Sequence, residues 1–103
     1  MSSIKVRAKV KGDVVEVKTL IKHEMETGQR KNSKTGETIP AHYIEEVVFE
    51  HKGQTVMTAY WGPAVSKNPY MSFRFAGGAK GDMINVTWRD NKGETDSLEA
   101  EIG

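Results

Sequence analysis

The sequence predicts an all-β protein, an antiparallel sandwich of about seven strands. Apolar and polar residues alternate along short runs, which is the pattern of strands with one buried face. Glycine-rich turn sequences separate these runs, and no stretch has the period of a helix. The chain has 103 residues, the size of one ordinary domain, and no shift in composition divides 1–103 into two.

The first predicted strand covers residues 4–11, where apolar residues alternate strictly with cations. The alternating residues are Ile4, Val6, Ala8 and Val10 on one face and Lys5, Arg7, Lys9 and Lys11 on the other. Gly12-Asp13 then forms a turn into a second strand, in which Val15, Val17 and Ile21 share a face. These two strands are expected to form a hairpin.

The strand predicted over 41–51 is apolar on both faces. Its residues divide into Tyr43, Val47 and Phe49 on one face and Ile44 and Val48 on the other. A strand of a sandwich needs one apolar face for its own core. We therefore take the second face as a candidate surface for a partner.

Four further strands follow, each with an apolar stripe. The stripes are Met57, Ala59 and Trp61; Met71, Phe73 and Phe75; Ile84, Val86 and Trp88; and Leu98, Ala100 and Ile102. Gly62-Pro63 ends the first of these strands because proline cannot donate to a sheet ladder. The core is expected to contain Val6, Val17, Phe49, Phe73, Val86 and Trp88.

About seven short strands in roughly 100 residues favour an immunoglobulin-like antiparallel β-sandwich. An open barrel of five or six strands has the same periodicity and stays an alternative. The disulfide core of antibody domains is excluded, because the chain has no cysteine.

Composition excludes several classes of function. Fifteen Lys and Arg against fourteen Asp and Glu give a net charge of +1, which lacks the basic excess of nucleic-acid binders. The absence of cysteine excludes a catalytic thiol and a thiolate metal ligand. No run approaches the roughly 18 apolar residues of a membrane span. The segment from Met1 to Arg7 has no apolar core for a signal peptide, so we expect no export signal and no membrane contact.

We predict no catalytic residue, no metal and no cofactor. A metal site would need His23, His42 and His51 to converge with a carboxylate such as Glu24 or Glu26, and their spacing matches no ligand motif. Surface or hydrogen-bonded histidines are expected instead. Ser66 is not in a Gly-x-Ser-x-Gly elbow, so no nucleophile is proposed.

Two loops are candidates for contact with a partner. The stretch 28–36 carries Arg30, Lys31 and Lys34 and no acid, which suits an anionic group or an acidic protein, although a solvated loop has the same composition. The second loop is bounded by aromatic residues and is rigidified by two prolines. Its residues are Gly62, Pro63, Ala64, Val65, Ser66, Lys67, Asn68, Pro69 and Tyr70. A structural crossover between two sheets is the alternative.

Several segments together resemble the SoxZ family over essentially the whole chain. They are DVVEVKTLIKHEMETGQRKNSKTG over 13–36, YWGPAVSKNPYMSFRF over 60–75, the opening KVRAK, and the pattern GD-x-I-x-V-x-W-x-D-N-x-G around Trp88. Glu24 stands where the family usually has proline, which bears on the rigidity of one turn.

The resemblance implies a non-catalytic subunit of the SoxYZ sulfur-carrier complex in thiosulfate oxidation. SoxY would be the partner, and its carboxy-terminal Gly-Gly-Cys-Gly-Gly arm would carry the sulfur intermediates, which other Sox enzymes load, oxidise and release in transient contacts. The resemblance also implies a periplasmic location, with export of the folded pair on the signal of SoxY. Homodimerisation of the isolated chain stays open.

Two other functions remain as alternatives. One is a stand-alone immunoglobulin-like binding module, which predicts a monomer with exposed Trp61 and Tyr70. The other is a superoxide-reductase-like iron enzyme on a similar sandwich, which needs several histidines and a thiolate. Three histidines and no cysteine count against the enzyme.

Overall fold

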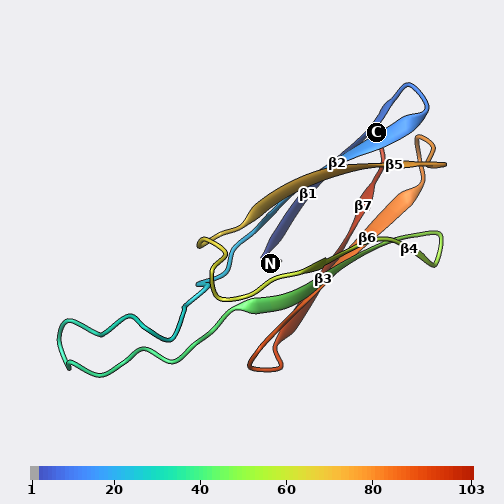
Figure 1. The fold of residues 1–103 in the computed structure, drawn as a ribbon. Coiled ribbons are helices and arrows are strands. Elements are labelled where there is room, and N and C mark those ends of the chain that lie inside the picture. Colours follow the sequence, from blue (N-terminus) through green and yellow to red (C-terminus); the bar gives the residue numbers. More distant parts are fainter. Residues whose placement is uncertain (1–2) are drawn as a thin grey trace.

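The computed structural model describes residues 3–103, which form two antiparallel sheets packed face to face (Figure 1). The strands are β1 (Ile4–Lys11), β2 (Val14–Ile21), β3 (Ile44–His51), β4 (Gln54–Tyr60), β5 (Tyr70–Ala76), β6 (Met83–Asp90) and β7 (Thr95–Glu101). The predicted all-β sandwich of seven strands is confirmed. The open barrel does not form, because the strands divide into two separate sheets.

One sheet has the order β1-β2-β5 and the other the order β4-β3-β6-β7. On one side of the sandwich the chain end bridges the sheets: Gly103 donates its N–H to the carbonyl of Ala8 (2.9 Å) and accepts the N–H of Val10 (3.0 Å). Strands β5 and β4 are the edges on the other side. The residues between β4 and β5 cross from one sheet to the other.

The core lies between the sheets and consists of the inward stripes of the strands. Fully buried members include Val15, Val17, Ile21, Ile44, Val47, Phe49, Ile84 and Val86. Trp88 is also buried, and its indole N–H donates to the hydroxyl of Ser3 (3.0 Å). Of the six residues predicted for the core, Val6 and Phe73 are only half-buried and pack against it. Both lie on edge strands, where one side of an inward residue has no neighbouring strand.

A β-bulge corrects the predicted faces of β3. The register between β3 and β6 shifts between Ile44 and Glu46, and the extra residue reverses the alternation of side chains. Ile44 therefore points into the core together with Val47 and is fully buried. Its predicted place on the opposite face was wrong, and of the pair assigned there Val48 alone remains.

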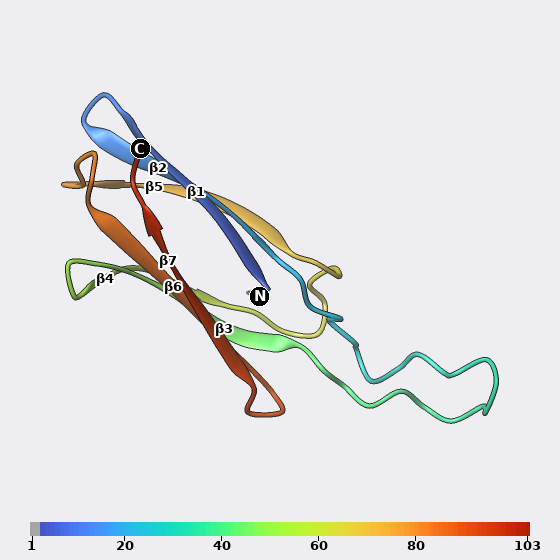
Figure 2. The ribbon, with the colours of Figure 1, turned by 180° about the vertical axis from the view of Figure 1, so that it is seen from behind.

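The segment 22–43 projects from one end of the sandwich as a long arm (Figures 1 and 2). Two isolated bridges, Glu26 with His42 and Lys31 with Thr38, join its outgoing and returning halves. The candidate stretch 28–36 lies in this arm and is exposed apart from the half-buried Gly28, whereas Met25 before it is buried against the core.

Residues 3–103 contain no helix suited to crossing a membrane. Met1 and Ser2, the first residues of the segment examined for an export signal, lie outside the described residues.

Candidate interaction site

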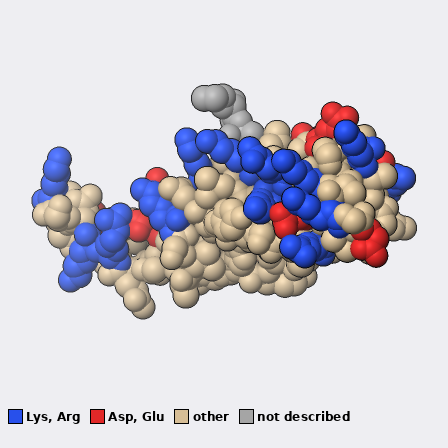
Figure 3. All heavy atoms as spheres, turned by 90° about the horizontal axis from the view of Figure 1, so that it is seen from above, with Lys and Arg blue, Asp and Glu red and all other residues tan. Residues whose placement is uncertain are grey.

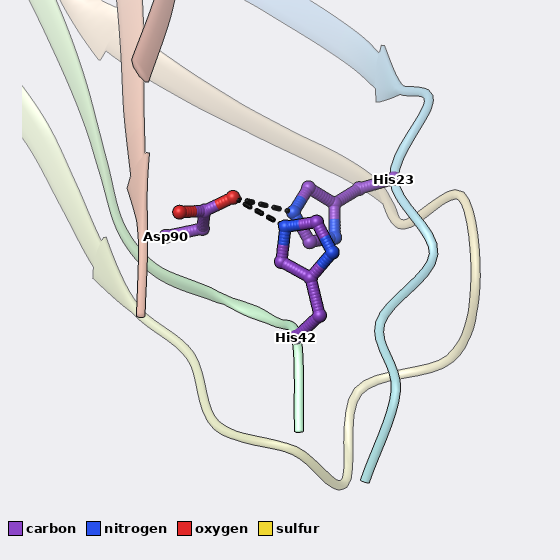
Figure 4. Close-up of side chains that lie close together, drawn as sticks. All are labelled: His23, His42 and Asp90. Carbon is purple, nitrogen blue, oxygen red and sulfur yellow. Dashed lines mark hydrogen bonds and ion pairs between the residues drawn. The ribbon is translucent and has the colours of Figure 1, made fainter. Parts of the chain in front are cut away.

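Three connections gather at the end of the sandwich from which the arm projects. They are the base of the arm, the crossover 61–69 and the turn that follows β6. Asp90, the last residue of β6, lies between His23 and His42 at the two ends of the arm (Figure 4). The cluster holds the base of the arm that carries the candidate stretch 28–36.

The carboxylate of Asp90 is completely buried and accepts four hydrogen bonds. Its Oδ2 accepts from Nε2 of His23 (3.1 Å) and Nε2 of His42 (2.7 Å). Its Oδ1 accepts the backbone N–H groups of Lys92 (3.0 Å) and Glu94 (2.9 Å). One side chain thus ties both ends of the arm to the hairpin turn between β6 and β7.

The charge of Asp90 is stabilised by these donors. Burial by itself raises the pKa of a carboxyl group, because it penalises the charged form. The hydrogen bonds from His23, His42 and the two backbone amides outweigh burial and hold the pKa of Asp90 below its ordinary value. The cluster is therefore built around an ionised carboxylate.

Asn91 strengthens the same connection. Its Oδ1 accepts the N–H of Tyr43 (2.8 Å), and its Nδ2 donates to the carbonyl of Ala41 (2.9 Å). Its own N–H donates to the carbonyl of Tyr43 (3.0 Å). The returning half of the arm is thereby hydrogen-bonded to the turn after β6.

The cluster of His23, His42 and Asp90 has three ligand-type atoms within 4.8 Å of one another. The hydrogen bonds, however, assign the ring proton of His23. Its Nδ1 accepts the N–H of Met25 (3.1 Å), so neutral His23 carries its proton on Nε2 and donates it to Asp90. A metal-binding histidine has the opposite arrangement, in which the other ring nitrogen donates. Because its proton is on Nε2, His23 has no lone pair on that nitrogen to bind a cation.

The third histidine belongs to the opposite end of β3. His51 contacts Asp82 (Nε2 to Oδ2, 2.8 Å), and this hydrogen bond is the main cause of the lowered pKa of Asp82. All three histidines are hydrogen-bonded to carboxylates. We expected surface or hydrogen-bonded histidines that do not converge, but His23 and His42 converge on one buried aspartate.

The carboxylates considered from the sequence are used elsewhere. Glu26 forms a bidentate ion pair with Arg30 (Nη2 to Oε2 2.7 Å, Nε to Oε1 3.0 Å), and these hydrogen bonds lower the pKa of Glu26. Glu24 lies 4.0 Å from the amino group of Lys67. The basic tip of the arm thus differs from the prediction, because Arg30 has an acidic partner. No described carboxylate pairs with Lys31 or Lys34.

The predicted partner-binding loop, 62–70, is held in place by Asn68. Its Oδ1 accepts the N–H of His23 (3.1 Å), and its own N–H donates to the carbonyl of His23 (3.1 Å). Its backbone is left-handed (φ 52°), a conformation that asparagine tolerates better than most residues. Asn68, a member of the candidate partner-binding loop, therefore joins the crossover to the arm.

The rest of this loop divides into anchored and exposed residues. Pro69 is buried and its carbonyl accepts the N–H of Ile21 (3.1 Å), while Val65 is half-buried against the core. Exposed residues are Pro63, Ala64, Ser66, Lys67 and Tyr70; Gly62 is half-buried. Tyr70 is 60% exposed, and Tyr60 at the end of β4 is 77% exposed. Preordered aromatic residues are typical of binding surfaces.

Between the edge strands β4 and β5, inward-facing apolar residues are only half-buried. We call this strip the seam; it consists of Met57, Ala59, Trp61, Val65, Met71 and Phe73. The register places Met57 beside Phe49 and Phe73 beside Val17, so both face the core. The seam was not predicted as a surface, because alternation assigns these residues to the interior without saying which strands are edges.

Comparison with known proteins gives a family. A family model described as "Sulphur oxidation protein SoxZ" matches residues 4–101. The chain belongs to the SoxZ family. The match runs from the start of β1 to the end of β7 in this SoxZ-family chain and confirms the resemblance in its sequence. Membership of this family gives the chain a role in the sulfur oxidation system. No curated protein matches the sequence.

Several solved structures resemble the SoxZ-family sandwich. A superoxide reductase (neelaredoxin) from Ignicoccus hospitalis is 15% identical with a TM-score of 0.59, covering 97% of this chain and 78% of that chain. A hypothetical protein from Pyrococcus horikoshii OT3 is 17% identical with a TM-score of 0.58, covering 97% and 87%. A superoxide reductase from Archaeoglobus fulgidus is 22% identical with a TM-score of 0.52, covering 95% and 83%. At these identities the likeness concerns the fold alone.

Proposed function

We propose that this chain is the non-catalytic subunit of the SoxYZ sulfur-carrier complex. It binds SoxY and helps to present the cysteine-bearing arm of SoxY to Sox enzymes during thiosulfate oxidation. The observation that carries the proposal is the SoxZ family match over residues 4–101. A chain without cysteine has no thiol to hold a sulfur adduct, so the covalent step belongs to the partner.

The seam and the loop 62–70 are the surface that we assign to SoxY. The apolar side chains of the seam are only half-buried, and their further burial by a partner removes apolar area from water. Tyr60 and Tyr70 flank it as large exposed aromatic residues. The hydrogen bonds between Asn68 and His23 fix the loop before binding, which lowers the entropy lost on association.

The arm is assigned to the transient contacts with Sox enzymes. Lys31 and Lys34 are exposed near its tip. Backbone hydrogen bonds, such as the one from the N–H of Ile39 to the carbonyl of Arg30 (2.7 Å), join the two halves of the arm there. Their charges suit an acidic enzyme surface or an anionic sulfur group. We further propose a periplasmic location, reached by export together with SoxY.

Co-expression with SoxY and affinity purification through this chain test the proposal. We expect to recover a chain that ends in Gly-Gly-Cys-Gly-Gly, identified by its intact mass, in a fixed stoichiometry. Val65→Asp should weaken the complex at least about tenfold, since it places a charge in the seam. Met83→Asp is the matched control, because Met83 is an exposed apolar residue of β6 on the outer face of the other sheet.

The outcomes separate the alternatives. If the folded Val65→Asp variant binds SoxY as tightly as the wild type, the crossover is a structural connection and the surface lies elsewhere. A monomer with no affinity for SoxY would favour a stand-alone binding module. Stoichiometric iron together with turnover of superoxide in the isolated chain would favour the superoxide-reductase-like enzyme.

A further inference from the structure

Cations concentrate on the outer face of the β1-β2-β5 sheet (Figure 3). We call this the basic face; its cations are Lys5, Arg7, Lys9 and Lys11 of β1, Lys18 of β2 and Arg74 of β5. The register places Arg7 beside Lys18, and Lys9 and Arg74 on either side of Glu16. The chain as a whole has a charge of +1, so this concentration reflects a separation of charges.

Glu16 is the one carboxylate among the residues that alternate outward on these three strands, and it is already occupied. It pairs with Arg74 (3.0 Å) and lies 3.7 Å from Lys18. The hydrogen bond from Arg74 is the main cause of the lowered pKa of Glu16. Within residues 3–103, no carboxylate forms an ion pair with Lys5, Arg7, Lys9 or Lys11. These four cations remain available to a partner.

The outer face of the β4-β3-β6-β7 sheet is mainly acidic. Glu50 and Glu99 flank Asn85 in the β3-β6-β7 register, and Glu101 lies beside Met83. The sandwich therefore has a positive side and a negative side. A charge distribution of this kind orients a protein as it approaches a charged partner.

We propose that the basic face docks an acidic protein surface. Along β1 the cations recur at every second residue, about 6.7 Å apart, which matches carboxylates at alternate positions of another strand. At one end of the face the half-buried Leu20 lies between Lys5 and the exposed Tyr70 in the register. A shallow pocket of about 280 Å³ lies there, lined by Lys5, Arg7, Lys18, Leu20 and Tyr70, among others. An apolar spot beside a charged area is typical of protein interfaces.

Other polyanions fit this face less well. Nucleic-acid binders that use a sheet face stack bases on several aromatic residues, whereas Tyr70 is the one aromatic residue on the outward positions of these strands. An anionic membrane would favour large apolar groups that insert beside the cations, and β1 presents none outward. The proposal does not depend on whether SoxY binds the seam, because the six cations of the basic face lie on the outside of one sheet. Tyr70 is the residue that the basic face shares with the surface assigned to SoxY.

The test maps an acidic peptide onto the isolated, full-length chain. The probe is a peptide of alternating Glu and Thr, added at low salt to isotope-labelled protein while amide chemical shifts are followed by NMR. We expect the shifts to concentrate at residues 5–11 and 16–18. Binding should weaken about tenfold in the triple variant Arg7→Glu, Lys9→Glu, Lys11→Glu, and its salt dependence should decrease.

The controls make the proposal refutable. Lys80→Glu with Lys92→Glu reverses exposed cations outside the basic face and should change peptide binding less than twofold. A duplex DNA of 20 base pairs and phosphatidylserine vesicles serve as competing probes. Shifts centred on the arm tip, tighter binding to either competitor, or equal affinity of the folded triple variant would overturn the proposal.

Discussion

His42 and His23 donate to the same oxygen of Asp90, although 48 and 67 residues respectively separate them from it in sequence. The hydrogen bond from Nε2 of His42 to Oδ2 of Asp90 is the shorter of the two, at 2.7 Å. It connects the returning end of the arm to the end of β6. One buried carboxylate therefore holds both ends of the arm at the turn after β6.

Replacing Asp90 with Asn should destabilise the fold by about 2–4 kcal/mol. The amide keeps one oxygen but cannot accept all four hydrogen bonds, so buried donors lose their partner. Urea unfolding followed by tryptophan fluorescence measures the loss. Asp82→Asn is the control at the opposite end of the sandwich and should cost clearly less. Equal losses would mean that the buried cluster has no special weight.

The lowered pKa of Asp90 also predicts a pH dependence. Because the folded pKa lies below the unfolded value of about 3.9, Asp90 stabilises the fold above that value. This contribution is lost as the pH falls through the folded pKa. Between pH 5 and pH 3 the stability of the wild type should therefore fall more steeply than that of Asp90→Asn. Parallel pH profiles for the two proteins would contradict this.

Thr19→Val should stabilise the protein by about 1 kcal/mol. Thr19 is 2% exposed, and its hydroxyl has no hydrogen-bond partner within the described part of the chain. Valine has nearly the same shape and removes an unsatisfied polar group. Thr19→Ser is the matched control, which keeps the hydroxyl, loses the methyl group and should destabilise. A loss of stability in Thr19→Val would show that the hydroxyl has a partner, for example a buried water.

Phe73→Ala should cost about 2–3 kcal/mol, and Phe49→Ala about 4 kcal/mol. The two rings pack edge to face with centroids 4.7 Å apart. Phe49 is fully buried, whereas Phe73 is half-buried in the seam. Chemical denaturation of both variants gives the order. If SoxY covers the seam, Phe73 becomes more buried in the complex. The losses of stability caused by Phe73→Ala and Phe49→Ala should then differ less in the complex than in the isolated chain.

Gly78→Ala should destabilise by about 1–3 kcal/mol. A Cβ at Gly78 would lie 2.5 Å from Cγ2 of Val15 and 3.1 Å from the ring of Phe75. Gly62→Ala is the control, since a Cβ there meets nothing within 4 Å. Thermal unfolding of both variants is sufficient. Similar melting temperatures would mean that the turn before β6 shifts to make room.

Reversing Lys31 and Lys34 to Glu should slow association with acidic Sox enzymes and leave the complex with SoxY intact. The two side chains lack acidic partners within 3–103, whereas Arg30 is held by Glu26. Turnover of the reconstituted Sox system at low salt measures the effect, and Lys80→Glu with Lys92→Glu, which changes the net charge equally, is the control. Unchanged turnover would identify the arm tip as a solvated loop.

The strands were predictable because alternation is a local property. Ile84, Val86 and Trp88 followed it and are buried. The bulge in β3 was not predictable. The face on which Ile44 lies depends on the register between β3 and β6, whose partner residues lie forty or more positions later in the sequence. Which stripes lie on edge strands also follows from strand order, and this explains why Val6 and Phe73 are less buried than expected.

The candidate site was only partly predictable for the same reason. The exposed arm and the crossover were visible as polar and proline-bounded segments. The meeting of His23, His42 and Asp90 requires the ends of β2, β3 and β6 to be neighbours, which no spacing in the sequence gives. A weak signal existed, because Asp90 begins the turn sequence Asp-Asn-Lys-Gly, where aspartate commonly accepts backbone amides.

The edge strand β4 carries a second irregularity, a register shift opposite Phe49 and Glu50. A regular, flat edge offers its free N–H and C=O groups to any extended chain, which is how sheets grow into fibrils. A bulge twists the edge and interrupts that template. The bulge in β4 thus lowers the risk that copies of this chain pair along the edge that borders the apolar seam.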